Sequence, residues 1–167
     1  MYPNEIIEGK RILIVDDEKD VVDLLCDLLS MCKIDSARSF EEAKRLLEEN
    51  EYDVAILDIM GVNGFELLNI ATARNIPALM LTAHALSEEN LKRSAEEGAH
   101  YFAPKDEMSK IDLFVVDIVE ARKKKKNIWT RWFERLGGYY DKRFTGPNWR
   151  EKHKKFWKEK LKEPEGV

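Results

Sequence analysis

The chain has 167 residues, of which 44% are hydrophobic, so it can bury one core with a small appendage besides. It contains no run of about 18 apolar residues that could span a bilayer, and its first residues lack the order of a signal peptide, so we expect a cytoplasmic globular protein. The only cysteines, Cys26 and Cys32, have neither zinc nor redox spacing and are expected to be plain thiols.

The net charge of -4 conceals two parts of opposite sign. From Arg122 to the end there are sixteen Lys and Arg against six Asp and Glu, whereas the rest of the chain has twelve against twenty-six. All four tryptophans also lie in the basic part. The sequence therefore predicts an acidic domain over residues 1–122 and a basic, Trp-rich extension over 123–167.

The acidic part alternates short apolar runs with segments of helical periodicity. The apolar runs predict strands at 11–15, 34–38, 54–57, 78–81 and 101–103. The periodic segments predict helices after Asp17, after Ser39, over 65–74, from Ser87 to Gly98 and over 108–122. Ser39 and Glu42 match a capping box. Five strand and helix units without a repeat indicate a doubly wound α/β fold.

Polar residues lie just past the ends of four of the predicted strands: Asp16 and Asp17, Asp58, Thr82 and, after Pro104, Lys105. Because ligands bind at the carboxyl ends of parallel strands, we expect these five side chains to share one site. Three crowded carboxylates repel one another, and a hard cation such as Mg²⁺ would keep them ionised. Taken singly, the acids could be helix caps, the Thr a strand former and the Lys a solvated side chain, so only the set is informative.

The segments RILIVDDEKDVVDLL, YDVAILD, MLTA and GAHYFAPK resemble the receiver domain of bacterial two-component response regulators, the CheY-like fold, over about residues 8–122. The resemblance implies a flavodoxin-like, five-stranded parallel sheet of order 2-1-3-4-5 with a short helical C-terminal extension. It also implies a phosphoprotein of phosphorelay signalling that receives phosphate from a histidine kinase or phosphotransfer protein and is not a turnover enzyme.

The resemblance assigns a role to each residue of the site. Asp58 is the phosphoacceptor, and Mg²⁺ is bound by Asp16, through water, by Asp17 and Asp58, and by the backbone carbonyl of Met60. Thr82, Ala83 and Lys105 contact the phosphoryl group. Lys105 and the metal neutralise the charge that develops on transfer.

By the same resemblance, Thr82 and Phe102 form the switch, and His84 influences the phosphate lifetime. An equally good interpretation of Phe102 is that it only fills the core. An equally good interpretation of His84 is that it is a half-exposed loop residue without such a role. The surface formed by 87–98, 101–103 and 108–122 is where such regulators meet partners or form homodimers.

Two features depart from the family pattern. The loop after Asp58, IMGVNG, is shorter than usual, which affects the Met60 ligand most. Pro104 precedes Lys105 and Asp106 follows it, so the usual cis proline after the lysine is missing; a cis bond before Asp106 would cost about 2.5 to 4 kcal/mol. A degenerate receiver scaffold, active only through its tail, is therefore the alternative.

The basic extension carries two apolar stripes. The first contains Trp129, Trp132, Phe133 and Leu136 and is expected to end where Gly137 and Gly138 break the helix. The second contains Trp149, His153, Phe156, Trp157 and Leu161. Two amphipathic helices are predicted, packed on the receiver or on each other, with contact to a protein partner, nucleic acid or an anionic membrane as the alternatives.

Overall fold

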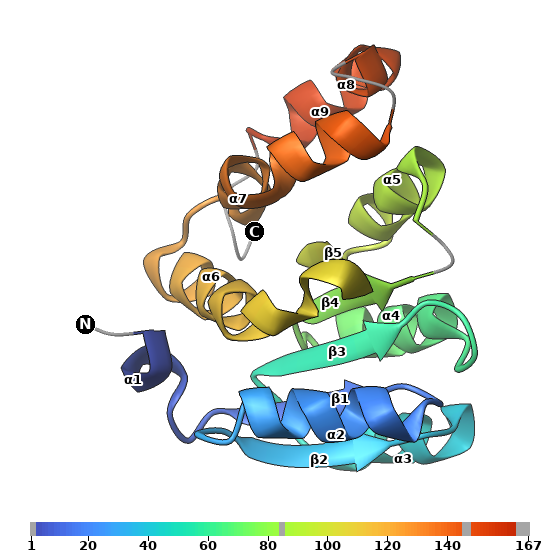
Figure 1. Cartoon of the computed structure of the whole chain (residues 1–167), viewed down its shortest axis with the longest axis vertical. Coiled ribbons are helices and arrows are strands. Elements are labelled where there is room, and N and C mark those ends of the chain that lie inside the picture. Colours follow the sequence, from blue (N-terminus) through green and yellow to red (C-terminus); the bar gives the residue numbers. More distant parts are fainter. Residues whose placement is uncertain (1–2, 84–85, 145–147, 163–167) are drawn as a thin grey trace.

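A parallel five-stranded sheet forms the centre of the computed structural model, which describes residues 3–83, 86–144 and 148–162 (Figure 1). The strands are β1 (Arg11–Val15), β2 (Lys33–Ala37), β3 (Val54–Asp58), β4 (Ala78–Thr82) and β5 (Tyr101–Pro104). Their order is β2-β1-β3-β4-β5, and every neighbouring pair is parallel. The predicted fold class and strand order are confirmed.

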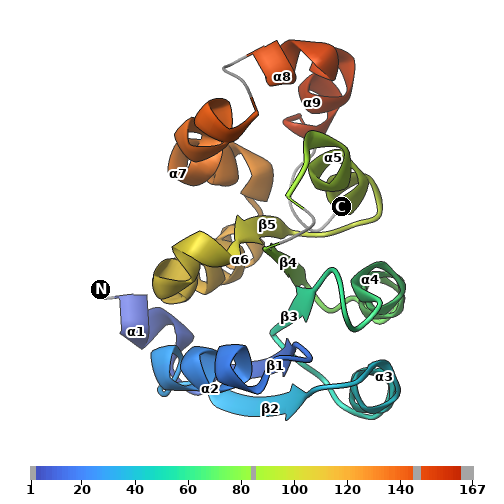
Figure 2. The same cartoon turned by 45° about the vertical axis from the view of Figure 1, so that its right-hand side comes forward.

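Helices cover both faces of the sheet, with α2 and α6 on one face and α3, α4 and α5 on the other (Figure 2). Their bounds are α1 (Pro3–Ile7), α2 (Lys19–Leu28), α3 (Phe40–Glu49), α4 (Gly64–Ala73), α5 (Glu88–Glu96) and α6 (Ile111–Lys124), and a 3-10 helix, η1 (Lys105–Lys110), precedes α6. The short helix α1, which packs against α6, was not predicted. Within the described ranges, no helix is long and apolar enough to cross a membrane.

The local signals that predicted these elements act in the structure. The side-chain oxygen of Ser39 accepts a hydrogen bond from the Glu42 amide, and that of Ser87 accepts one from the Asn90 amide, so both helices are capped as expected. The central strands β3 and β4 are buried at every position, as strands covered on both faces must be. Strand register then sets the ends of β1, β3 and β4 beside one another.

The C-terminal extension forms three helices, α7 (Ile128–Arg143), α8 (Asn148–Lys152) and α9 (Lys154–Lys160), which we call the tail. The predicted break at Gly137 and Gly138 is wrong, because α7 continues through both. A Cβ at Gly137 would lie 2.7 Å from Nη2 of Arg150 in α8. The missing side chain at Gly137 therefore leaves room for α8 to pack against α7, and it does not end α7. The helical cost of a glycine, about 1 kcal/mol, is offset by packing of the apolar face.

The second predicted tail helix is also wrong in its extent. His153 has φ -122° and ψ 31°, which is not helical, and it divides this stretch into α8 and α9. The tail nevertheless has a real core, since the rings of Trp129, Trp132, Trp149 and Trp157 are buried and contact one another. This aromatic group is continuous with the core of the sheet.

The tail lies along the open edge of the sheet, beyond β5 and between α5 and α6 (Figures 1 and 2). Helix α6 ends at Lys124, after which only Lys125, Lys126 and Asn127 lead into α7. Both predicted arrangements therefore occur together: the tail helices pack on each other and on the acidic part. The boundary between residues 122 and 123 stays a prediction.

Candidate functional site

The ammonium group of Lys105 lies among carboxylates at the carboxyl end of the sheet. Its Nζ atom is 2.8 Å from Oδ2 of Asp16, 3.4 Å from Oδ1 of Asp58 and 3.3 Å from Oε1 of Glu18. Asp16 follows β1, Asp58 ends β3, and Lys105 begins η1 directly after β5. The predicted convergence of these residues is observed, and no cis peptide bond occurs in the described chain to bring Lys105 there.

Glycines allow the loop after β3 to close on this group. Gly61 has φ +81°, and a Cβ built on it would lie 2.6 Å from Oδ1 of Asp17. A Cβ on Gly64 would lie 2.2 Å from the backbone oxygen of Asp58. The shortened loop therefore passes against both acids, and only glycine fits at these two positions. No described contact tests the Met60 carbonyl, so that ligand stays a prediction.

Burial controls the ionisation of the site. Asp16 and Asp58 are 1% and 4% exposed, respectively. Burial, followed by the neighbouring Asp16 carboxylate, raises the pKa of Asp58 to about 7. Burial acts to lower the pKa of the Lys105 ammonium, but its pKa is raised overall because Asp16 and Asp58 hold the charged form. In this site the Lys105 ammonium thus faces several carboxyl groups, of Asp16, Asp58 and Glu18.

An oxygen-rich group suited to a cation lies at the start of α2. Carboxylate oxygens of Asp16, Asp17 and Glu18 approach within 4.8 Å of one another. Oδ2 of Asp16 is buried and accepts no hydrogen bond of ordinary geometry from the described residues, leaving the Lys105 ammonium as its charge partner. Carboxylate oxygens in such a group are what a hard divalent cation prefers. Glu18 was not predicted; its place directly after the acid pair was the only available signal.

The remaining predicted site residues are placed as follows. Thr82 ends β4, is 1% exposed and lies opposite Pro104 in the sheet register, whereas Ala83 directly follows it and is exposed. Phe102 is fully buried, and its ring lies 5.8 Å from the ring of Tyr140 in α7. His84 lies outside the described residues. Both interpretations of Phe102 remain open, but its contact is with the tail, which the sequence did not predict.

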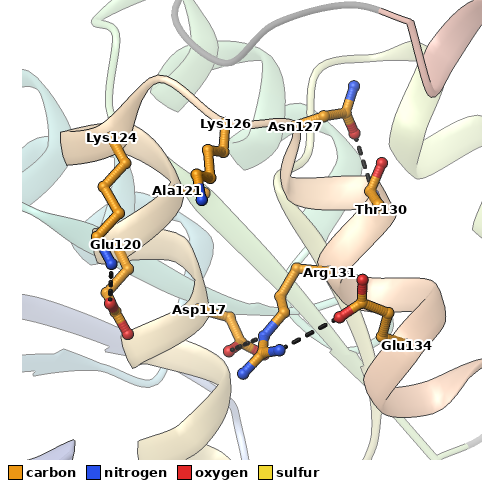
Figure 3. A pocket seen from close by; sticks show the side chains of 9 residues that line it. All are labelled: Asp117, Glu120, Ala121, Lys124, Lys126, Asn127, Thr130, Arg131 and Glu134. Atoms are coloured by element: carbon orange, nitrogen blue, oxygen red, sulfur yellow. Dashed lines mark hydrogen bonds and ion pairs between the residues drawn. The ribbon is translucent and has the colours of Figure 1, made fainter.

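A concave region of about 430 Å³ lies between α6 and α7, away from the strand ends, and none of the predicted site residues lines it (Figure 3). Its walls carry carboxylates and cations that pair with one another, including Asp117 with Arg131 and Glu120 with Lys124. At the strand ends, by contrast, several carboxyl groups surround one ammonium group. This difference in charge pairing distinguishes the candidate site from the pocket.

Comparisons with known proteins agree with the geometry. The family model described as the response regulator receiver domain matches residues 12–118. The heme response regulator HssR of Staphylococcus aureus (strain Newman) is 39% identical over 83 residues, which are 46% of this chain and 37% of HssR. The two-component response regulator ARR18 of Arabidopsis thaliana is 36% identical over 83 residues, 46% of this chain and 13% of ARR18. The chain thus spans well under half the length of these relatives.

Solved structures show the same fold. The receiver domain of the Francisella response regulator 1452 has a TM-score of 0.60 at 23% identity, covering 67% of this chain and 98% of that one. A CheY-like receiver domain protein from Methanospirillum hungatei JF-1 has a TM-score of 0.57 at 27% identity, with the same coverage of both chains. About a third of this chain lies outside each likeness.

Proposed function

Because this chain belongs to the response regulator receiver family, we propose that it accepts a phosphoryl group on Asp58 from a histidine kinase or a phosphotransfer protein, with Mg²⁺ as cofactor. The observation that carries the proposal is the position of the Lys105 ammonium, 2.8 Å from Asp16 and 3.4 Å from Asp58. The alternative of a degenerate scaffold would not need a half-buried cation and two buried carboxylates at one sheet edge. In cells, the protein would be a cytoplasmic phosphoprotein.

The residues at the strand ends fit a divalent cation. Asp16 and Asp17 offer carboxylate oxygens within reach of each other, and the loop at Gly61 approaches Asp17 closely. Asp58 and the carbonyl of Met60 would complete the protein ligands, as the family resemblance implies. When bound, the cation would supply positive charge that keeps the carboxylates ionised and neutralises the transferred group.

The chain's own residues would then carry out one transfer. An ionised Asp58 oxygen attacks the phosphorus, forming an O–P bond as the P–N bond of a phosphohistidine or the P–O bond of a small acyl phosphate breaks. The leaving imidazole takes up a proton, or acetate leaves with its charge. Lys105 balances charge on the phosphoryl oxygens, and Thr82 and Ala83 contact them. Since Asp58 keeps the group, the chain is a phosphate acceptor and not a turnover enzyme.

Intact mass spectrometry after incubation with Mg²⁺ and acetyl phosphate tests this function. We expect a labile adduct of one phosphoryl group on the wild type and none on Asp58→Asn. Lys105→Met should fold but form the adduct much more slowly, since the nearest cation is lost. An unmodified wild type, or an equally modified Asp58→Asn variant, would refute the assignment.

A further inference from the structure

Helix α7 of the tail is bonded directly to the edge strand β5. The indole Nε1 of Trp132 donates a hydrogen bond of 2.8 Å to the backbone oxygen of Phe102, and the hydroxyl of Tyr140 donates one of 3.2 Å to the same oxygen. Trp132, Tyr140 and Phe102 are all fully buried. The tail therefore donates hydrogen bonds to a backbone oxygen of β5 and covers this edge of the sheet. An uncovered edge strand would be available for pairing with other chains.

The tail also neutralises a buried acid of α6. Asp117 is 3% exposed, and its carboxylate accepts a hydrogen bond from Arg131 (Figure 3). It also accepts hydrogen bonds from both Nε and Nη2 of Arg135 and from the hydroxyl of Tyr101. A buried carboxylate without these cations would be strongly unfavourable. Asp117 thus requires a cationic partner, and the tail supplies it with Arg131 and Arg135.

Further contacts join the tail to the segment after β5 and to α5. Nη2 of Arg143 lies 3.2 Å from Oδ2 of Asp106, and the hydroxyl of Tyr139 donates to the same oxygen at 3.4 Å. At the other side, Nζ of Lys152 lies 2.7 Å from Oε1 of Glu88 in α5. The tail consequently occupies the surface of α5, β5 and α6, the one expected to meet partners.

The contacts with Phe102 and Asp106 hold a stretch of five residues at both ends. Lys105 lies within this stretch and reaches from it to Asp16 and Asp58. A phosphoryl group on Asp58 would place its oxygens farther from the sheet edge than the carboxylate oxygens. Where Lys105 follows them by a backbone movement, the stretch between Phe102 and Asp106 shifts relative to α7, and the contacts of the tail with Phe102 and Asp106 resist that shift.

We infer that the tail is the built-in partner of the α5, β5 and α6 surface, and that its docking opposes phosphorylation of Asp58. This inference rests on the proposed function. Because coupling between two binding events is reciprocal, a phosphoryl group loosens the tail, and a loosened tail makes phosphoryl binding more favourable. Phosphorylation then exposes two surfaces at once: β5 with its neighbours, and the aromatic, arginine-bearing face of α7.

Amide hydrogen exchange of the full chain measures the first half of the coupling. Beryllofluoride with Mg²⁺ serves as a reversible mimic of the phosphoryl group. In the wild type, we expect amides of α7 to exchange about fivefold faster or more when beryllofluoride is added, the lower end of typical coupling between sites. Asp58→Asn should show no change. A parallel acetyl phosphate reaction, followed by intact mass, establishes whether Asp58 accepts phosphate at all.

The second half is tested by conservative variants of α7. Trp132→Phe combined with Tyr140→Phe removes both donors to Phe102 while keeping aromatic rings in place. We expect this double variant to bind beryllofluoride at about fivefold lower concentration than the wild type. Lys152→Gln is the matched control, because the ion pair that it removes does not touch the stretch from Phe102 to Asp106, and the Lys152 side chain is largely exposed, so its loss weakens the docking of the tail little. Its beryllofluoride midpoint should equal that of the wild type.

The outcomes separate this inference from the proposed function. If the phosphoryl adduct forms but α7 exchange is unchanged or slower, the function stands and the coupling is refuted. If the double variant and Lys152→Gln shift the midpoint equally, coupling through the Phe102 segment is likewise refuted. If no adduct forms in the wild type, the proposed function fails and this inference falls with it.

Discussion

Asp58 is the residue on whose charge the site depends. It ends a strand buried at every position, close to Asp16, and it has the Lys105 ammonium as its cationic neighbour. The polar residues after each strand predicted this grouping, because parallel strands bring their carboxyl ends together. The sequence could not show that Glu18 would join it, because the reach of a surface side chain depends on the folded backbone around it.

The raised pKa of Asp58, about 7, gives a pH-dependent stability. An unfolded Asp has a pKa of about 3.9, so between pH 4 and 7 the folded state binds more protons, and wild-type stability falls as pH rises through this window. We therefore expect metal-free Asp58→Asn to match the wild type near pH 4 and to exceed its free energy of unfolding by roughly 1 to 3 kcal/mol at pH 8. Urea denaturation across this range measures the difference.

Asp27→Asn is the control for this experiment, because Asp27 is exposed on α2 and its loss should leave the pH profile unchanged. Adding Mg²⁺ should narrow the gap between Asp58→Asn and the wild type, since the cation favours the ionised acid. If the difference in free energy of unfolding between Asp58→Asn and the wild type did not depend on pH, burial would not disfavour the ionised form of Asp58. That result would contradict the raised pKa of this residue.

At the scale of elements, the strands, the capped helices and the helical character of the tail followed from local sequence, whereas the bounds of the tail helices did not. Short apolar runs and the caps at Ser39 and Ser87 are local signals that the structure retains. The glycine pair at Gly137 and Gly138 is also a local signal for a helix end, but contacts with α8 and β5 override it. A local sequence pattern cannot reveal packing of this kind, because the contacting segments are far apart in the chain.

The two glycines of α7 provide a matched test of that packing. A Cβ at Gly138 would have nothing within 4 Å, whereas one at Gly137 would displace Nη2 of Arg150 from its hydrogen bond to Asp141. We expect Gly138→Ala to raise the free energy of unfolding by about 0.5 to 1 kcal/mol through helix propensity, and Gly137→Ala to give no gain or a loss. Thermal or urea unfolding measures both, and equal gains would contradict the observed position of α8.

At the scale of the whole molecule, an acidic receiver carries its own basic partner. The opposite charges of the two parts were visible in the sequence, and the structure places them in contact through Asp117, Asp106 and Glu88. The tail tryptophans lie in this interface and in the tail core, so they are not displayed for stacking on bases or insertion into lipid. Contact with nucleic acid or membrane stays a prediction that only the exposed lysines would support.

The account as a whole depends on Asp58 being the residue that carries the phosphoryl group, and chemical trapping tests this most directly. Borohydride reduces an aspartyl phosphate to homoserine with release of phosphate, which leaves a permanent mark at the modified position. After treatment with Mg²⁺, acetyl phosphate and borohydride, peptide mass spectrometry should find homoserine at position 58 and at neither Asp16 nor Asp17. Homoserine at either of those positions instead, or at none of the three, would contradict the account.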